Sequence, residues 1–109
     1  MIHKIGEEIR VVRDYEIETI LSENKLQVKE GDKGFIDSSG SIHYTSGQAR
    51  GKIHRLREVE VKGYDYENIA KMLWNRLKSQ FEIEEFLEDY DVSEKDVIEE
   101  LEEVLSDIL

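Results

Sequence analysis

A chain of 109 residues that is 39% apolar and 38% charged fits one domain, or two small modules, with a modest hydrophobic core. The apolar fraction excludes a disordered chain, and the complete lack of Cys excludes disulfides, cysteine nucleophiles and cysteine metal ligands. The opening segment, MIHKIGEEIR, has no apolar signal-peptide core, and no apolar run approaches the length of a membrane span. We therefore expect a cytoplasmic protein with no membrane partner.

The net charge of −11 is distributed unevenly along the chain. Residues 1–62 carry 11 basic and 11 acidic side chains, whereas residues 63–109 carry 4 basic and 15 acidic ones. Between Ser38 and Arg57 there is no acidic residue at all. The sequence thus contains a basic segment followed by an acidic C-terminal half, a pattern that concerns partners and solubility and not the fold.

Residues 5–62 have the pattern of short strands joined by Gly-containing turns. The predicted strands are EEIRVVRD, LQV, FID, IHYT, KIHRL and EVEV, and the turns between them include KEGDKG, SSGS and SGQARG. Short strands at this spacing predict a small antiparallel barrel. The stretch EIETIL, residues 16–21, fits a strand and a single helical turn equally well.

Residues 65–109 have the apolar periodicity of amphipathic helices. Apolar side chains recur at helical spacing in three groups: Ile69, Leu73, Leu77 and Phe81; Ile83, Phe86, Leu87 and Tyr90; and Val97, Ile98, Leu101, Val104, Leu105 and Ile108. Asp65 and Ser93 are predicted N-caps of the first and last helix. Because the stripes need a packing partner, we expect an ordered helical module with its acids on the opposite face. The predicted fold is α+β, with a β module at 1–63 and an acidic module of two or three helices at 64–109, docked as one compact unit.

The N-terminal module also contains a pattern typical of one family. The stretch IGEEIRVV is followed by VKEGDKGFI, where a Gly-Asp-x-Gly turn precedes an apolar pair, at Gly31, Asp32, Gly34, Phe35 and Ile36. Over residues 4–62 this resembles SH3-like small barrels of the KOW type. The resemblance implies an SH3-like antiparallel β-barrel that binds protein or nucleic acid, and it implies no chemistry.

One acidic stretch partly fits a calcium-binding loop. DYDVSEKDVIEE places oxygen ligands at positions 1, 3, 5 and 12 of an EF-hand-like loop, at Asp89, Asp91, Ser93 and Glu100. Position 6, however, is Glu94, where the sharp turn requires Gly. A turn followed by a capped helix is the favoured interpretation, and we expect no metal site.

Catalytic patterns are missing from the sequence. The imidazoles are His3, His43 and His54, no Ser lies in a nucleophile-elbow pattern, and there is no phosphate-binding GxxxxGK[ST]. His43 and His54 flank a predicted hairpin and could face each other, although two solvated strand histidines are favoured. We expect no enzyme and no cofactor.

The basic segment HYTSGQARGKIHRLR is a candidate nucleic-acid contact. Its cations could neutralise phosphates and an exposed Tyr could stack on a base, which selects Tyr44, Arg50, Lys52, Arg55 and Arg57. The alternatives are a solubilising hairpin, or one that pairs with the acids of the chain's own C-terminal helices. A nucleic-acid-binding or regulatory module that uses hairpin 43–57 is therefore the second functional hypothesis.

The acidic helices carry the leading hypothesis. Regularly spaced carboxylates on a rigid surface can imitate a phosphate backbone and occupy the cationic channel of a nucleic-acid enzyme. The candidates are Glu84, Glu85, Glu88, Asp89, Glu99, Glu100, Glu102 and Glu103. The alternative is a solvated helix face.

In size and composition the chain resembles small acidic phage or prophage inhibitors, including anti-CRISPR proteins that act on Cas9. These proteins share no common motif, so the resemblance assigns no residue. It implies a basic protein partner, Cas9 or another nucleic-acid enzyme, in the cytoplasm of a bacterial host cell. A phage structural or assembly protein is a third class.

Overall fold

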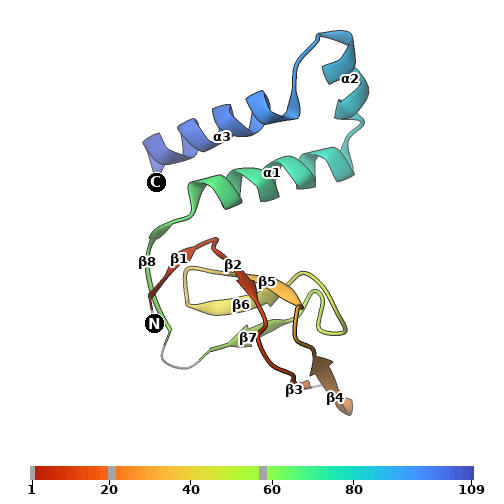
Figure 1. The fold of residues 1–109 in the computed structure, drawn as a ribbon, viewed down its shortest axis with the longest axis vertical. Coiled ribbons are helices and arrows are strands. Elements are labelled where there is room, and N and C mark those ends of the chain that lie inside the picture. Colours follow the sequence, from red (N-terminus) through yellow and green to blue (C-terminus); the bar gives the residue numbers. More distant parts are fainter. Residues whose placement is uncertain (1, 20–21, 57–58) are drawn as a thin grey trace. The chain divides into compact units, whose positions relative to one another are not determined.

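The computed structural model describes residues 2–19, 22–56 and 59–109. Within them, eight strands precede three helices, which confirms the α+β class (Figure 1). The chain divides into two compact units, Met1–Gly63 and Tyr64–Leu109, which we call the strand unit and the helical unit. None of the described helices is long and apolar enough to cross a membrane.

The strands pair in three small sheets. A four-stranded antiparallel sheet has the order β2-β5-β6-β7, β3 and β4 form a hairpin, and β1 pairs with β8. The strand bounds are β1 (Ile2–Ile5), β2 (Glu8–Arg10), β3 (Tyr15–Thr19), β4 (Ser22–Val28), β5 (Lys33–Ile36), β6 (Ser41–Tyr44), β7 (Ile53–Arg55) and β8 (Glu60–Tyr64). The ambiguous stretch at 16–21 is therefore a strand as far as Thr19, and its last two residues, Ile20 and Leu21, lie outside the described residues.

The described strands do not close into one barrel. Gly6, with a φ of 85°, separates β1 from β2, and residues 11–14 separate β2 from β3. Backbone hydrogen bonds continue at both places, from the Gly6 N–H to the Ile36 carbonyl and from the Val11 N–H to the Asp32 carbonyl, but the strands still pair in three separate sheets and not in one closed ring. The result is a set of short strands around one core, in which β2 forms a strand over only part of the predicted stretch EEIRVVRD.

The core of the strand unit lies on one face of the four-stranded sheet. Ile36 of β5 is paired with Ile42 of β6, and both are buried, because alternate residues of a strand point to the same face. The buried cluster consists of Val11, Ile17, Val28, Ile36, Ile42, Tyr44 and Ala49. The β3–β4 hairpin contributes Ile17 and Val28, so the core joins two of the sheets.

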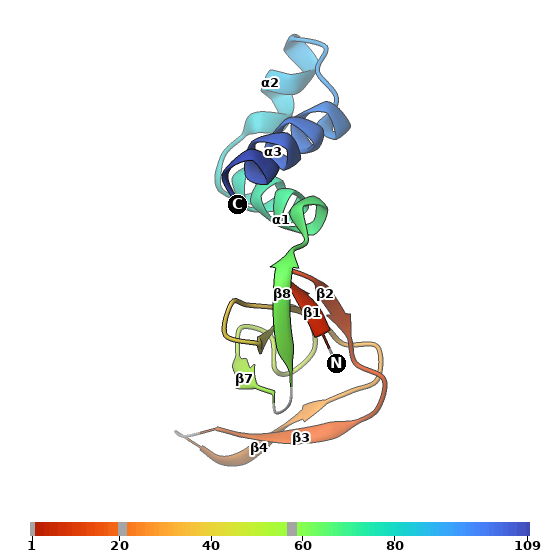
Figure 2. The ribbon, with the colours of Figure 1, turned by 90° about the vertical axis from the view of Figure 1, so that its left-hand side faces the viewer.

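The helical unit consists of α1 (Tyr66–Gln80), α2 (Ile83–Asp89) and α3 (Glu94–Ile108). The Asp65 side chain accepts a hydrogen bond from the Asn68 N–H at 3.0 Å, and Ser93 Oγ accepts one from the Asp96 N–H at 3.2 Å. Both predicted N-caps are thus confirmed. Within this unit, α1 and α3 lie side by side and run in opposite directions, with α2 at the end where the chain turns (Figures 1 and 2).

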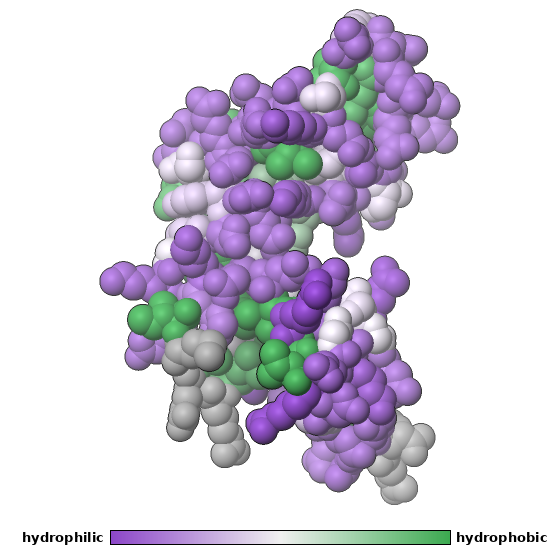
Figure 3. All heavy atoms as spheres, in the orientation of Figure 1, coloured by the Kyte–Doolittle hydropathy of each residue, from purple (hydrophilic) through white to green (hydrophobic). Residues whose placement is uncertain are grey.

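The apolar stripes of the helices are only partly covered. Ala70 and Trp74 of α1 and Leu87 of α2 are buried, whereas no residue of α3 is. Val104 and Ile108 keep 53% and 74% of their surface exposed. The expectation of a packed stripe along α3 is therefore wrong for its outer row, and Figure 3 shows apolar atoms between the hydrophilic ones on the helices.

Candidate functional site

The eight predicted carboxylates lie on two different helices of the helical unit. α2 carries Glu84, Glu85, Glu88 and Asp89, and α3 carries Glu99, Glu100, Glu102 and Glu103. Seven of the eight are exposed, and Glu102 is half-buried. The Glu102 carboxylate acts electrostatically on Lys71 of α1, so this residue does not belong to an outward acidic face. The eight side chains therefore form two acidic groups rather than one continuous surface.

A hollow at the corner between α2 and α3 gathers four carboxylates. Its volume is about 370 Å³, and its acidic lining consists of Glu84, Glu88, Asp91 and Glu94. Leu87 and Val92 form its apolar floor. We call this feature the acidic hollow. Glu84 and Glu88 were predicted as part of an acidic face, whereas Asp91 and Glu94 reach this place through the turn between the helices.

Lys78 of α1 links the two acidic helices. Its Nζ lies 3.0 Å from the Glu94 carboxylate and 3.9 Å from that of Glu84. The Lys78 ammonium holds the pKa of the Glu94 carboxyl below its ordinary value. Lys78 thus forms ion pairs with two of the four carboxylates. The acidic hollow therefore keeps an excess of negative charge at neutral pH.

Next to the acidic hollow, an apolar groove of about 320 Å³ runs along α3. Val92, Val97, Leu101 and Val104 line it, and Asp96 and Glu100 flank it. Val92 also lines the acidic hollow, so the two concavities are adjacent. Apolar side chains bounded by acids form a surface suited to a partner that is both apolar and cationic.

The basic hairpin differs from the sequence-based expectation in one residue. Arg50, Lys52 and Arg55 are exposed, but Tyr44 keeps only 2% of its surface and belongs to the core. Its hydroxyl lies 2.5 Å from that of Tyr15 and 3.1 Å from Nδ1 of His54. Burial and the Tyr15 hydrogen bond raise the pKa of Tyr44. The expectation that this ring stacks on a base is therefore wrong, since it is inaccessible.

Arg57, the last predicted cation of the hairpin, lies outside the described residues. The remaining cations are spread over the turn and the edge strand β7 of the four-stranded sheet. The hairpin therefore has exposed cations that could contact phosphates, but the ring of Tyr44 is buried and cannot stack on a base.

The outward face of the four-stranded sheet carries an aromatic pair, Phe35 and His43, that was not predicted from the sequence. Phe35 of β5 is paired with His43 of β6, and their rings stack at a centroid distance of 4.7 Å and an interplanar angle of 14°. The register places Lys33, Arg10 and Arg55 on the same face, together with one acid, Glu8, which is paired with Phe35. The alternation of residues along each strand could have predicted that these side chains point away from the core. Which of them lie next to each other depends on the register between strands, which the sequence alone does not fix.

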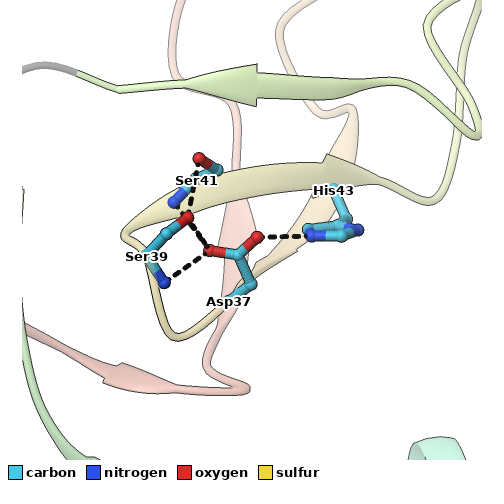
Figure 4. Close-up of polar contacts among 4 residues, drawn as sticks. All are labelled: Asp37, Ser39, Ser41 and His43. Carbon is cyan, nitrogen blue, oxygen red and sulfur yellow. Dashed lines mark hydrogen bonds and ion pairs between the residues drawn. The ribbon is translucent and has the colours of Figure 1, made fainter.

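His43 is held by a polar cluster at the turn between β5 and β6 (Figure 4). A carboxylate can only accept, so Nε2 of His43 donates to Oδ2 of Asp37 at 2.7 Å. Oδ1 of Asp37 accepts from the Ser39 hydroxyl at 2.6 Å and from the Ser39 and Ser41 N–H groups at 2.9 and 3.0 Å. Gly40, with a φ of 84°, completes the turn. Asp37 therefore organises this hairpin.

The same cluster does not provide a nucleophile with a base. The Ser39 hydroxyl donates to Asp37 and lies 3.0 Å from the Ser41 hydroxyl, so neither serine is paired with the imidazole in Figure 4. His43 and His54 do not face each other either: His43 is paired with Ile53, and His54 with Ile42 on the opposite, core side of the sheet. The less favoured possibility, that the two histidines face each other, is thus wrong.

The EF-hand-like pattern adopts the turn-and-helix geometry. Ser93 is the N-cap of α3, and Glu94, which would have to form the sharp turn of a calcium loop, is its first helical residue. Asp91 has a φ of 53° and forms the turn instead. Over residues 2–19, 22–56 and 59–109, no group of three or more His, Cys, Asp or Glu side chains has the geometry to hold a metal ion.

Acid should weaken the hairpin that Asp37 organises. Desolvation raises the pKa of this carboxyl, but hydrogen bonds from Ser39, His43 and Ser41 outweigh it and hold the pKa well below its usual range. A carboxyl whose pKa is lower in the folded protein than in the unfolded chain stabilises the fold at every pH above the unfolded-chain pKa. This stabilisation is lost progressively as the pH falls below about 4. Asp37→Asn should therefore cost about 1 to 3 kcal/mol at pH 7 and less near pH 3, where the carboxyl is already protonated in the unfolded chain but still ionised in the folded one.

Urea denaturation at both pH values, followed by NMR signals of β5 and β6, measures this difference. Asp107→Asn, a change of an exposed α3 carboxylate outside the strand unit, is the control. If Asp37→Asn costs the same at both pH values, the ionised carboxylate does not stabilise the turn.

Comparisons with known proteins found no relative of this chain. The chain matches no family model, no curated protein and no solved structure.

Proposed function

We propose that the chain is a non-enzymatic interaction protein whose helical unit binds a cationic surface of a nucleic-acid enzyme. The observation that carries this proposal is the acidic hollow, which four carboxylates line and in which Lys78 pairs with two of them, Glu84 and Glu94. In its sharpest form, the protein is a phage or prophage inhibitor of the anti-CRISPR kind that occupies a nucleic-acid channel of Cas9 in a bacterial host. The strand unit, on this proposal, is a relative of SH3-like barrels that has lost barrel closure.

The distribution of charge supports binding to a cationic channel. Exposed carboxylates on α2 and α3 create a negative potential that attracts Lys and Arg side chains and steers association. A cationic channel that holds phosphates can bind carboxylates in the same way, because either ligand displaces the ions already bound there. The protein and the nucleic acid therefore compete for the channel. Because the acids form two groups, the contact is expected at the acidic hollow and at the outer side of α3, around Glu100 and Glu103.

DNA cleavage by a Cas9 nuclease with increasing amounts of the protein tests this proposal. Glu84, Glu88, Glu100 and Glu103 are exposed and are changed together to Gln. We expect the wild type to inhibit cleavage and the variant to require at least about tenfold more protein, mainly because association is slower.

A matched control variant removes the same number of charges from the strand unit. It carries Gln at the exposed positions Glu8, Glu18, Glu30 and Glu60 and has the same net charge. If both variants inhibit as well as the wild type, the helical acids are only a solvated face. If the wild type does not inhibit, this nuclease is not the target.

The second candidate function is nucleic-acid binding by the outward face of the four-stranded sheet. The Phe35–His43 stack favours it, because stacked rings bordered by Lys33, Arg10 and Arg55 form a surface for bases and phosphates. Single-stranded DNA should then bind the wild type at about 50 mM salt, where counterion release favours binding most, and should bind Phe35→Ala more weakly. The absence of binding by the wild type would eliminate this candidate.

A further inference from the structure

The outer row of α3 is an apolar seam that is half-buried in its first half and exposed in its second half. It consists of Val97, Leu101, Val104 and Ile108, which follow one another at intervals of four, three and four residues. This spacing places them on one side of the helix and is that of the contact positions in paired helices. Val104 and Ile108 are 53% and 74% exposed. We call this row the apolar seam.

The neighbours of the apolar seam differ on its two sides. Ile98 and Leu105 are half-buried, as are Val97 and Leu101, and by helical spacing they lie beside Glu102, whose carboxylate acts on Lys71 of α1. By helical spacing, Asp96, Glu100 and Asp107 lie along the other side. Asp96 and Glu100 also flank the groove that Val92, Val97, Leu101 and Val104 line. A partner helix in this groove would therefore contact valine and leucine side chains centrally and carboxylates along one edge.

We propose that the apolar seam binds an amphipathic helix of the partner whose apolar face is bordered by Lys or Arg. This inference rests on the proposed function and names the part of the partner that the helical unit contacts. A helix in the groove buries the seam, and its basic residues meet Asp96, Glu100 and Asp107. The acidic hollow shares Val92 with the groove, so a further cation at the end of that helix would meet Glu84 and Glu88.

Charge complementarity favours this occupant over a second copy of the chain. Two copies facing each other through the seam would bring the same acidic border into the interface twice, and α3 carries only one base, Lys95, to compensate. A basic helix instead finds opposite charges along the border. It also fits the cationic surface that the proposed function requires.

A synthetic helical peptide tests the inference with the full-length protein. The probe has Leu at the a and d positions of three heptads and Lys at the flanking positions. A scrambled peptide of the same composition, which has no apolar face, is the control for simple charge attraction. Fluorescence anisotropy should show the amphipathic peptide binding at least about tenfold more tightly than the scrambled one.

Variants of the protein locate the site of peptide binding. Val104→Asn together with Ile108→Asn should reduce the affinity about tenfold, and both side chains are exposed enough for the fold to tolerate the change. Val12→Asn, at an 81% exposed position of the strand unit, should bind like the wild type. Equal binding of both peptides, or unchanged binding by the seam variant, would overturn the inference.

The nuclease assay separates this inference from the proposed function. If the seam variant inhibits cleavage like the wild type while the acidic variant does not, the proposed function stands and the helix-binding seam is refuted. Loss of inhibition by the seam variant supports both the proposed function and the helix-binding seam. Sedimentation of the wild type addresses the other occupant: a dimer that the seam variant abolishes would show that a second copy covers the seam, contrary to the inference.

Discussion

Replacing Trp74 with Ala should abolish the ordered structure of the helical unit. Trp74 is 3% exposed and is one of three buried side chains there, with Ala70 and Leu87. Removing a buried Trp side chain costs about 3 to 5 kcal/mol. A unit of the size of Tyr64–Leu109 is stable by only about 2 to 7 kcal/mol in total. The variant should therefore lose most of the helical circular-dichroism signal at 222 nm.

Trp74→Phe is the matched control, because it keeps an aromatic ring at the same place. It should lower the midpoint of thermal unfolding and retain the helical signal at room temperature. Leu73→Ala, at a 42% exposed position of the same helix, should have a small effect. If Trp74→Ala melts like the wild type, Trp74 does not hold α1 and α3 together, and the two-helix packing is incorrect.

Replacing Gly34 with Ala should strongly destabilise the four-stranded sheet. Gly34 lies within β5, and a Cβ at this position would be 2.5 Å from the His43 carbonyl oxygen and 2.8 Å from Cγ1 of Ile42. The first neighbour is backbone of the adjacent strand and cannot move without breaking the β5–β6 pairing. Overpacking of this kind costs about 1 to 3 kcal/mol and occasionally more. Urea denaturation followed by NMR signals of β5 and β6 measures the loss.

Gly51→Ala separates this steric effect from the conformational freedom of glycine. Gly51 has a φ of 84°, and a Cβ at this position would meet no heavy atom within 4 Å, so Ala there has only the backbone cost of about 1 kcal/mol. Gly34→Ala should be the more destabilising change. The reverse order would show that β5 and β6 are not as closely paired as the structure indicates.

Local patterns predicted much of this fold. Alternation and Gly-containing turns placed β5, β6 and β7, because both are properties of neighbouring residues. Asp65 and Ser93 were recognisable as N-caps for the same reason, since a cap bonds to backbone only three residues ahead. Gly34 shows the limit: the sequence suggested a turn glycine, whereas the structure places it in a strand, where another backbone leaves no room for a side chain.

The candidate sites depended on contacts between distant residues and were predicted less well. Tyr44 lies in a basic segment, but the alternation of β6 turns its ring into the core. Periodicity identified the apolar stripe of α3 correctly, yet it could not reveal that α1 covers only part of it, because coverage depends on the neighbouring helix. The acidic hollow likewise needs the turn at Asp91 to bring Glu94 beside Glu84 and Glu88.

The affinity of the wild-type protein for Cas9, measured with and without nucleic acid and at two salt concentrations, tests the central claim most directly. If carboxylates of the helical unit occupy a phosphate-binding channel, affinity should fall at least about tenfold between roughly 50 and 200 mM salt, and guide RNA or DNA should compete with the protein. Binding that is insensitive to salt and indifferent to nucleic acid would contradict the claim that these acids imitate a phosphate backbone.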